Sequence, residues 1–239
     1  MKRSHFAVLS ALGALVSILL LGSVWMRFGR HDVAPPPALS GQRITRAYDF
    51  ADFTRVGAQG VWQVTLARGD AWTAELSYPA ELEQYLKVGV EDHQLMLRYS
   101  LERGWWRNVG RRGEQGMAAR VTMPALDHVD LSGTASLVFS GFEGAELDIS
   151  TTGATKIDGT DSRYERVDLD MSGAGEADLR GVATTSVKID LSGASKVVLR
   201  MAGGRLEGDV SGATSLEYFG TVSSLDVDTS GIASVKKLD

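Results

Sequence analysis

Residues 190–199 read DLSGASKVVL, and this pattern recurs through the second half of the chain. A serine or threonine followed by glycine stands at Ser132–Gly133, Thr152–Gly153, Ser172–Gly173, Ser192–Gly193, Ser211–Gly212 and Ser230–Gly231. Successive pairs are 20, 20, 20, 19 and 19 residues apart. A single dipeptide means little, but near-constant spacing over so many copies indicates a repeat architecture.

The flanks of the dipeptide repeat as well. Apolar residues alternate on the approach to each serine, as Val187, Ile189 and Leu191 do before Ser192. Alternation with a period of two is typical of a strand with one buried face. A repeat of about 20 residues cannot bury that face alone, whereas stacked repeats can. The repeats therefore predict an all-β fold, a single-stranded β-helix (β-solenoid) with rungs of about 20 residues.

Each repeat glycine is expected to make a turn between two strands, because glycine adopts positive φ without strain. These predicted turn residues are Gly133, Gly153, Gly173, Gly193, Gly212 and Gly231.

The N-terminus predicts a membrane segment. Residues 6–26 are uncharged and mostly apolar, and about 20 such residues cross a hydrocarbon core of about 30 Å. We therefore expect a transmembrane helix that acts as an uncleaved anchor, with a cleaved signal peptide as the alternative. The short basic start at Lys2 and Arg3 favours a single-pass inner-membrane protein with its body in the periplasm; a secreted or surface-exposed body is the alternative.

The chain divides into four predicted regions. Residues 1–31 form the anchor or signal peptide, and residues 32–43 a proline-rich linker. Residues 44–120 form an N-terminal β part, with hairpins expected at Gly69–Asp70, between strands 61–66 and 72–78, and around His93. Residues 121–239 hold the repeats.

Charge and composition exclude several functions. Residues 121–239 contain 19 acidic and 10 basic side chains, and such an acidic body repels phosphate backbones, so we expect no binding of nucleic acid. The chain has no cysteine, which excludes disulfides and thiolate metal sites. No cofactor is predicted.

Three stretches carry a family resemblance: RVTMPALDHVDLSGTASLVFSG at 120–141, DLDMSGAGEADL at 168–179 and KIDLSGASKVVL at 188–199. Together with residues 50–99, they resemble the head GIN domain family, whose members are described as auto-transporter adhesins of bacterial envelopes. The resemblance implies a right-handed β-helical fold and an envelope location, and it supplies no catalytic residues.

The repeat serines do not predict an enzyme. A nucleophilic serine needs a neighbouring base, and none of the four histidines recurs beside a repeat serine. A polysaccharide-active enzyme on a β-helix stays an alternative, although no cluster of catalytic side chains supports it.

Aspartates stand two residues before most of the repeat serines. Stacking would place them along one outer edge, where solvent and hydrogen bonds to turn amides would relieve their repulsion. Calcium bridging is the alternative, although the glycine-rich calcium nonapeptide is absent. The row begins at Asp130 and is interrupted once, at Ser150; its candidate calcium residues are Asp170, Asp190, Asp209 and Asp228.

The loop at 101–120 is the candidate ligand-binding segment, because tryptophan stacks on sugars and arginine pairs with anionic head groups. Its candidate residues are Trp105, Trp106, Arg103, Arg107, Arg111 and Arg112. The alternative is that the loop only covers and solvates the body. The expected ligand is a glycan, an anionic lipid or an envelope protein.

The sequence thus predicts a non-catalytic, membrane-anchored binding or scaffolding module of the cell envelope. A self-associating structural element is the alternative. Lys236 and Lys237 at the end of the last repeat resemble edge-blocking charges, which limit such association.

Overall fold

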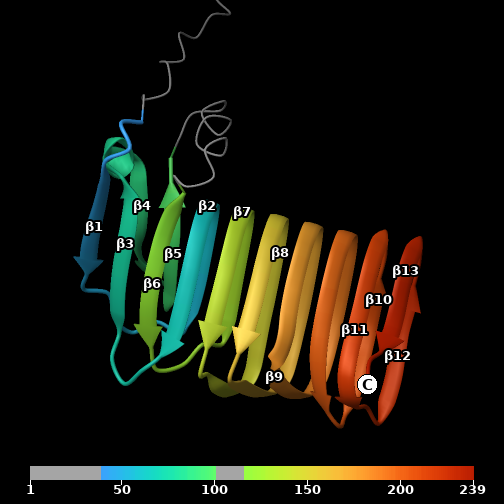
Figure 1. Cartoon of the computed structure of the whole chain (residues 1–239). Helices are drawn as coiled ribbons and strands as arrows, with labels where there is room; N and C mark the ends of the chain where they lie inside the picture. Colours follow the sequence, from blue (N-terminus) through green and yellow to red (C-terminus); the bar gives the residue numbers. More distant parts are fainter. Residues whose placement is uncertain (1–38, 101–115) are drawn as a thin grey trace, which may run out of the picture. The chain divides into compact units, whose positions relative to one another are not determined.

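The computed structural model describes residues 39–100 and 116–239, and β-strands dominate them (Figure 1). In chain order the elements are β1 (Arg43–Tyr48), β2 (Arg55–Arg68), β3 (Thr73–Pro79), the 3₁₀ helix η1 (Ala80–Tyr85), β4 (Leu86–Glu91), β5 (Gln94–Tyr99), β6 (Met117–Met123), β7 (His128–Ser140), β8 (Glu143–Thr160), β9 (Ser162–Ala202), β10 (Arg205–Val210), β11 (Ala213–Thr221), β12 (Ser224–Thr229) and β13 (Ile232–Lys237).

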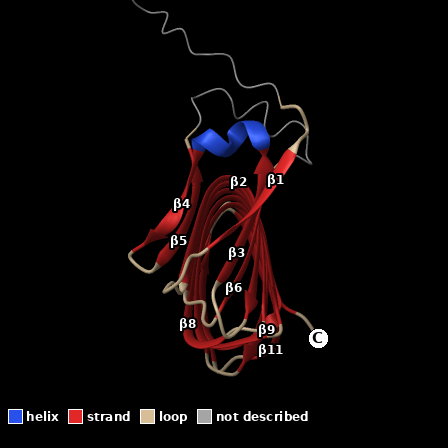
Figure 2. Cartoon of the chain, turned by 90° about the vertical axis from the view of Figure 1, so that its left-hand side faces the viewer, coloured by secondary structure: helices blue, strands red, loops and turns tan. Residues whose placement is uncertain are grey.

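All of these strands belong to one mixed sheet. Its main path runs β1-β3-β6-β2-β7-β8-β9-β10-β12, while β5 joins β2 to β4 and β11 joins β9 to β13. The long strands bend, so the sheet curls back on itself (Figure 2). Buried apolar side chains form the core. The part of each repeat before its glycine is called the approach arm, for example residues 147–152 of β8, and the part after it the exit arm, residues 154–160.

Parallel pairing places each repeat beside its equivalent. Gly133 of β7 lies opposite Gly153 of β8, which lies opposite Gly173 of β9. The same register aligns the apolar positions, so that Val129, Ile149 and Leu169 form one buried row. Residues that are 20 positions apart in the sequence therefore lie side by side on neighbouring strand segments of the sheet.

The glycine column depends on the missing side chain. Gly153 has φ of +113°, and a Cβ added there would lie 2.3 Å from the carbonyl oxygen of Gly133. The column also includes a member that the spacing does not reveal, since Gly60 of β2 lies opposite Gly133. β2 is therefore a further repeat, separated from the others by residues 69–127.

The N-terminal part uses different pairing. β1, β3 and β6 are linked by antiparallel ladders, and β4 pairs antiparallel with β5. Trp62, Tyr78 and Phe53 are among its fully buried side chains. The hairpin expected around His93 is present, with Asp92 and His93 at positive φ. The hairpin expected at Gly69–Asp70 is wrong, because β6 lies between β2 and β3.

Two buried tyrosines form hydrogen bonds between segments that are far apart in the sequence. The hydroxyl of Tyr164 donates to the carbonyl of Leu126 at 2.8 Å, and burial raises the pKa of Tyr164 well above its usual value. The hydroxyl of Tyr99 accepts the backbone N–H of Val61 at 2.9 Å beside the Gly60 turn, and burial raises the pKa of Tyr99 to about 12.

The predicted fold class, a single-stranded β-helix that follows a transmembrane helix, is wrong. The strands instead form one 13-stranded mixed sheet, because the N-terminal strands join the same sheet as the repeats. The antiparallel pairing of these N-terminal strands has no counterpart in the repeat pattern of the sequence. All-β composition and the in-register stacking of repeats are as predicted.

The predicted location is corrected too. Across residues 39–100 and 116–239, no helix has the length and apolar character to cross a bilayer, so a single-pass inner-membrane protein with a periplasmic body is not supported. The segment at 6–26 lies outside the described residues.

Candidate functional site

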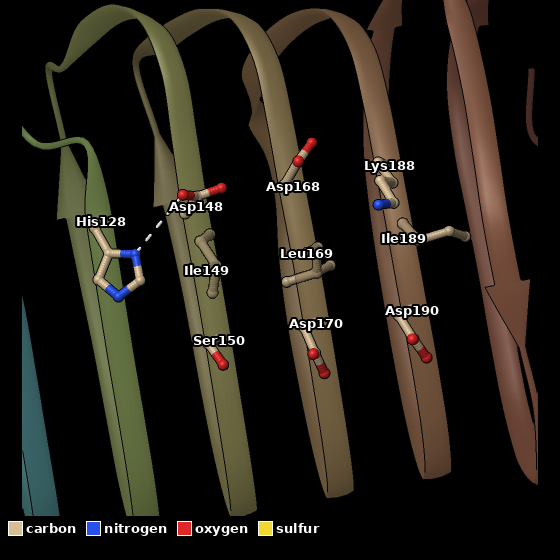
Figure 3. Close-up of a pocket in the computed structure, with 10 residues that line it drawn as sticks. All are labelled: His128, Asp148, Ile149, Ser150, Asp168, Leu169, Asp170, Lys188, Ile189 and Asp190. Atoms are coloured by element: carbon tan, nitrogen blue, oxygen red, sulfur yellow. Dashed lines mark ion pairs between the residues drawn. The ribbon is translucent and has the colours of Figure 1, made fainter.

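A polar groove crosses the approach arms of β7, β8 and β9 (Figure 3). It has a volume of about 290 Å³. We call it the acidic groove; its polar lining residues are His128, Asp148, Ser150, Asp168, Asp170, Lys188 and Asp190.

The groove follows from strand alternation. Ile149, Leu169 and Ile189 point into the core and are at most 2% exposed. Their neighbours on both sides therefore point outward. Because the repeats are in register, these outward side chains form two rows (Figure 3). The first row is His128, Asp148, Asp168 and Lys188, and the second is Ser150, Asp170 and Asp190.

In the first row, Asp168 has a basic partner. The Nε of Arg166 lies 2.7 Å from Oδ1 of Asp168 and 3.4 Å from Oε1 of Glu146. Nδ1 of His128 lies 3.8 Å from Oδ2 of Asp148. Arg166 thus pairs with Asp168 and Glu146, whereas the contact of His128 with Asp148 is an ion pair only when the histidine is protonated.

The second row is not neutralised. Within the described part of the chain, Asp170 and Asp190 form no ion pair, and both are exposed. Asp190 lies opposite Asp209, and Asp209 opposite Asp228, so the predicted aspartate row is in register. Neighbouring strands are about 4.8 Å apart, and two unit charges at that distance repel by about 1 kcal/mol in water. The row is a strip of negative potential open to solvent.

One cluster of three carboxylates lies outside the aspartate row. Among the described residues, oxygens of Glu146, Asp148 and Asp168 lie within 4.8 Å of one another. The Arg166 guanidinium already contacts Glu146 and Asp168, so a cation would have to displace it. Calcium binding by Asp170, Asp190, Asp209 and Asp228 stays a prediction.

A second groove lies on the exit arms, and its charges are balanced. It has a volume of about 640 Å³ and is lined mainly by small residues of three stacked repeats, together with Trp62 and Gly116. Nζ of Lys156 lies 3.6 Å from Oε2 of Glu176 in its wall. Nearby, hydrogen bonds from Arg180 hold the pKa of the Asp178 carboxyl below its usual value. The charged side chains in the wall of this second groove are thus paired, unlike Asp170 and Asp190 in the acidic groove.

The site residues predicted from the sequence fall into two groups, a loop and the turn glycines. Trp105, Trp106, Arg103, Arg107, Arg111 and Arg112 lie outside the described residues, and their role stays a prediction. The six predicted turn glycines all have positive φ, from +80° at Gly231 to +115° at Gly173. The sequence does not single out Arg166 or His128; only their register with the acidic residues of β8 gives them a role.

The acidic groove lacks an activated nucleophile. His128 and Ser150 share no hydrogen bond in the described structure, and the contact of His128 is with Asp148. Nucleophilic catalysis needs a base within hydrogen-bonding reach of the nucleophile. The arrangement can attract and hold positive charge.

A family model identifies the family of this chain, and solved structures share its fold. Residues 52–186 match the family model described as "Putative auto-transporter adhesin, head GIN domain". The crystal structure of a "putative adhesin" from Bacteroides fragilis is 17% identical and superposes with a TM-score of 0.61, over 84% of this chain and 99% of that chain. A "putative lipid binding protein" from Parabacteroides distasonis is 13% identical with a TM-score of 0.50, over 84% of this chain and 98% of that one. No curated protein matches the chain.

Proposed function

This chain belongs to the family of putative auto-transporter adhesins with a head GIN domain, and we propose that it is a non-catalytic binding module that holds a basic segment of a partner protein along its acidic groove. The family description supports adhesion, as does the name of the Bacteroides fragilis structure. The groove supplies the chemistry of recognition.

One observation carries the proposal: Asp170 and Asp190 stand unpaired and exposed in a groove, while Asp168 of the neighbouring row is paired with Arg166. Unpaired carboxylates at a fixed spacing attract lysine and arginine side chains. A basic partner would relieve the repulsion that parallel stacking imposes.

The dimensions suit an extended peptide. Four adjacent strand segments, from β7 to the second repeat of β9, span about 14 Å at about 4.8 Å per step. An extended chain advances by about 3.3 Å per residue, so about four residues cover that length. Asp209 and Asp228 prolong the negative strip beyond the groove for a longer ligand.

Binding of fluorescently labelled hexalysine by the full chain, followed by fluorescence anisotropy, tests the proposal. The D170N/D190N variant removes two groove charges and keeps the side-chain shapes. If each exposed ion pair contributes about 0.2–1 kcal/mol, affinity falls by about 2- to 30-fold. Added salt should weaken binding to the native chain, because it screens exposed charges.

D158N/E165Q is the matched control, since it removes the same number of charges from residues that do not line the groove. We expect its affinity to stay within about twofold of the native value. Equal losses in the two variants would show that only net charge matters, and would overturn the assignment of the groove.

A further inference from the structure

The sheet ends in two strands that each have one neighbour. Within the described residues, β12 pairs only with β10, and β13 pairs only with β11. They are the approach and exit arms of the last repeat and lie together at one end of the sheet (Figure 1). Each therefore presents a row of backbone groups without a strand partner. We call β12 and β13 together the C-terminal edge.

The core is open at this edge. Leu225 of β12 is 49% exposed, although Leu206, its partner in β10, is fully buried. Val227 and Val235 are only half-buried, and Ile232 is 86% exposed. In the other repeats, the inward-facing side chains are covered by the next repeat. The inward-facing side chains of the last repeat are not covered, and a further layer of strands would bury them.

The two strands of the edge carry opposite charges. β12 holds Asp226 and Asp228, and β13 holds Lys236 and Lys237. All four are exposed, and in the described structure none of them forms an ion pair. The edge is thus negative on its approach arm and positive on its exit arm.

We propose that two copies of this chain associate through the C-terminal edge, with β12 of each copy beside β13 of the other about a two-fold axis. This arrangement sets the aspartates of one copy against the lysines of the other, twice by symmetry. Opposite charges across neighbouring strands stabilise a sheet, and like charges destabilise it. The opposed apolar rows would cover each other.

The same charges disfavour the other two arrangements. Placing β12 on β12 and β13 on β13 sets acid against acid and lysine against lysine. Head-to-tail stacking would bring β13 beside β1, which ends the sheet on the same arm and carries Arg43, a cation without an ion-pair partner in the described structure, and Arg46, which pairs with Glu83. The edge therefore specifies a closed dimer, and growth into filaments is opposed.

The proposal is independent of the acidic groove and is tested by sedimentation of the full chain over a wide range of concentrations. The native chain should form a dimer. K236E/K237E makes the whole edge acidic and D226K/D228K makes it basic, and each should weaken dimerisation by more than about tenfold. A melting curve for each variant checks that it remains folded.

Mixing the two variants is the decisive measurement, because an acidic edge then meets a basic one and heterodimers should form. The fourfold variant D226K/D228K/K236E/K237E should dimerise like the native chain. If the native chain stays monomeric, if each variant alone dimerises as well as the native chain, or if the mixture forms no heterodimer, the proposal is overturned.

Discussion

The parallel repeats of β7–β13 and the mixed N-terminal strands β1–β6 handle charge in opposite ways. In the antiparallel ladder between β3 and β6, Glu75 lies opposite Arg120, with 3.5 Å between Oε1 and Nη1. In the parallel stack, Asp190 lies opposite Asp209. Antiparallel pairing brings different sequence stretches together, whereas an in-register repeat sets each residue against its own equivalent.

Stacking equivalents benefits some residue types and penalises others. Apolar rows gain a continuous core, and glycines gain a column in which carbonyl and Cα approach closely. Aspartates gain only repulsion. The repeats pair charges only where their sequences diverge, as at Glu146 opposite Arg166 and Lys156 opposite Glu176. Function is expected where the like charges remain.

The largest difference between the two regions should come from adding one methyl group. In G153A, the new Cβ must move the Gly133 carbonyl that lies 2.3 Å away, at a φ of +113°. Backbone strain costs about 1–3 kcal/mol and overpacking a further 1–3 kcal/mol. We expect the free energy of unfolding to fall by about 2–6 kcal/mol in a denaturant titration.

Two alanine variants separate these causes. Gly203 also has positive φ, but a Cβ there would meet nothing within 4 Å, so G203A should cost only the strain, about 1–2 kcal/mol. Gly89 of β4 has neither constraint, and G89A should change stability by less than about 1 kcal/mol. Equal effects of G153A and G89A would remove the distinction between the two regions.

The parallel region could be predicted from the sequence because the constant spacing of the repeats gives the register of its strands. Twenty residues separate Gly133 from Gly153, and the structure sets them side by side. Gly60 belongs to the same column but is 73 residues away from Gly133, because residues 69–127 intervene. Apolar alternation around Gly60, at Val56, Ala58 and Val64, was the signal that could have identified this repeat.

The N-terminal part could not be predicted in the same way. The pairing of β3 with β6 joins segments about 45 residues apart, and local sequence carries no register for such a ladder. The aspartate row of the candidate site was predicted from spacing, and its register is as expected. The difference in ion pairing between the aspartate row and the first row was not predicted, because it depends on which carboxylates the side chains of Arg166 and His128 contact.

Alkaline pH should weaken the N-terminal part through Tyr99. Burial raises the pKa of Tyr99 from the ordinary 10.0 to about 12, so the folded protein keeps a proton that the unfolded chain releases. Stability is then complete below pH 10 and is lost as the pH rises towards 12, by about 2–3 kcal/mol in all.

Denaturation midpoints between pH 9 and 12 measure this loss. Y99F removes the titrating hydroxyl and leaves the N–H of Val61 without its partner, which costs about 1–3 kcal/mol at neutral pH. Its stability should nevertheless vary less between pH 10 and 12 than that of the native chain. An unchanged slope would show that another group controls the alkaline transition.

The smallest effect tests the electrostatic contrast itself. Asp190 stands between Asp170 on one side and Asp209 on the other, so D190N removes two like-charge contacts while keeping the side chain's shape. We expect a gain in the free energy of unfolding of about 0.2–1 kcal/mol at low salt, which vanishes at high salt because the charges are exposed.

E75Q in the antiparallel ladder should do the reverse, because it removes the partner of Arg120, and should lose up to about 1 kcal/mol with the same salt dependence. Urea titrations of both variants at low and high salt measure these opposite signs. If D190N were instead destabilising at low salt, the carboxylate of Asp190 would stabilise the native fold, and the aspartate row would be a structural feature. A stabilising D190N leaves binding as the reason to retain a charge that folding opposes, in keeping with the observation that sites tuned for binding are often not optimal for stability.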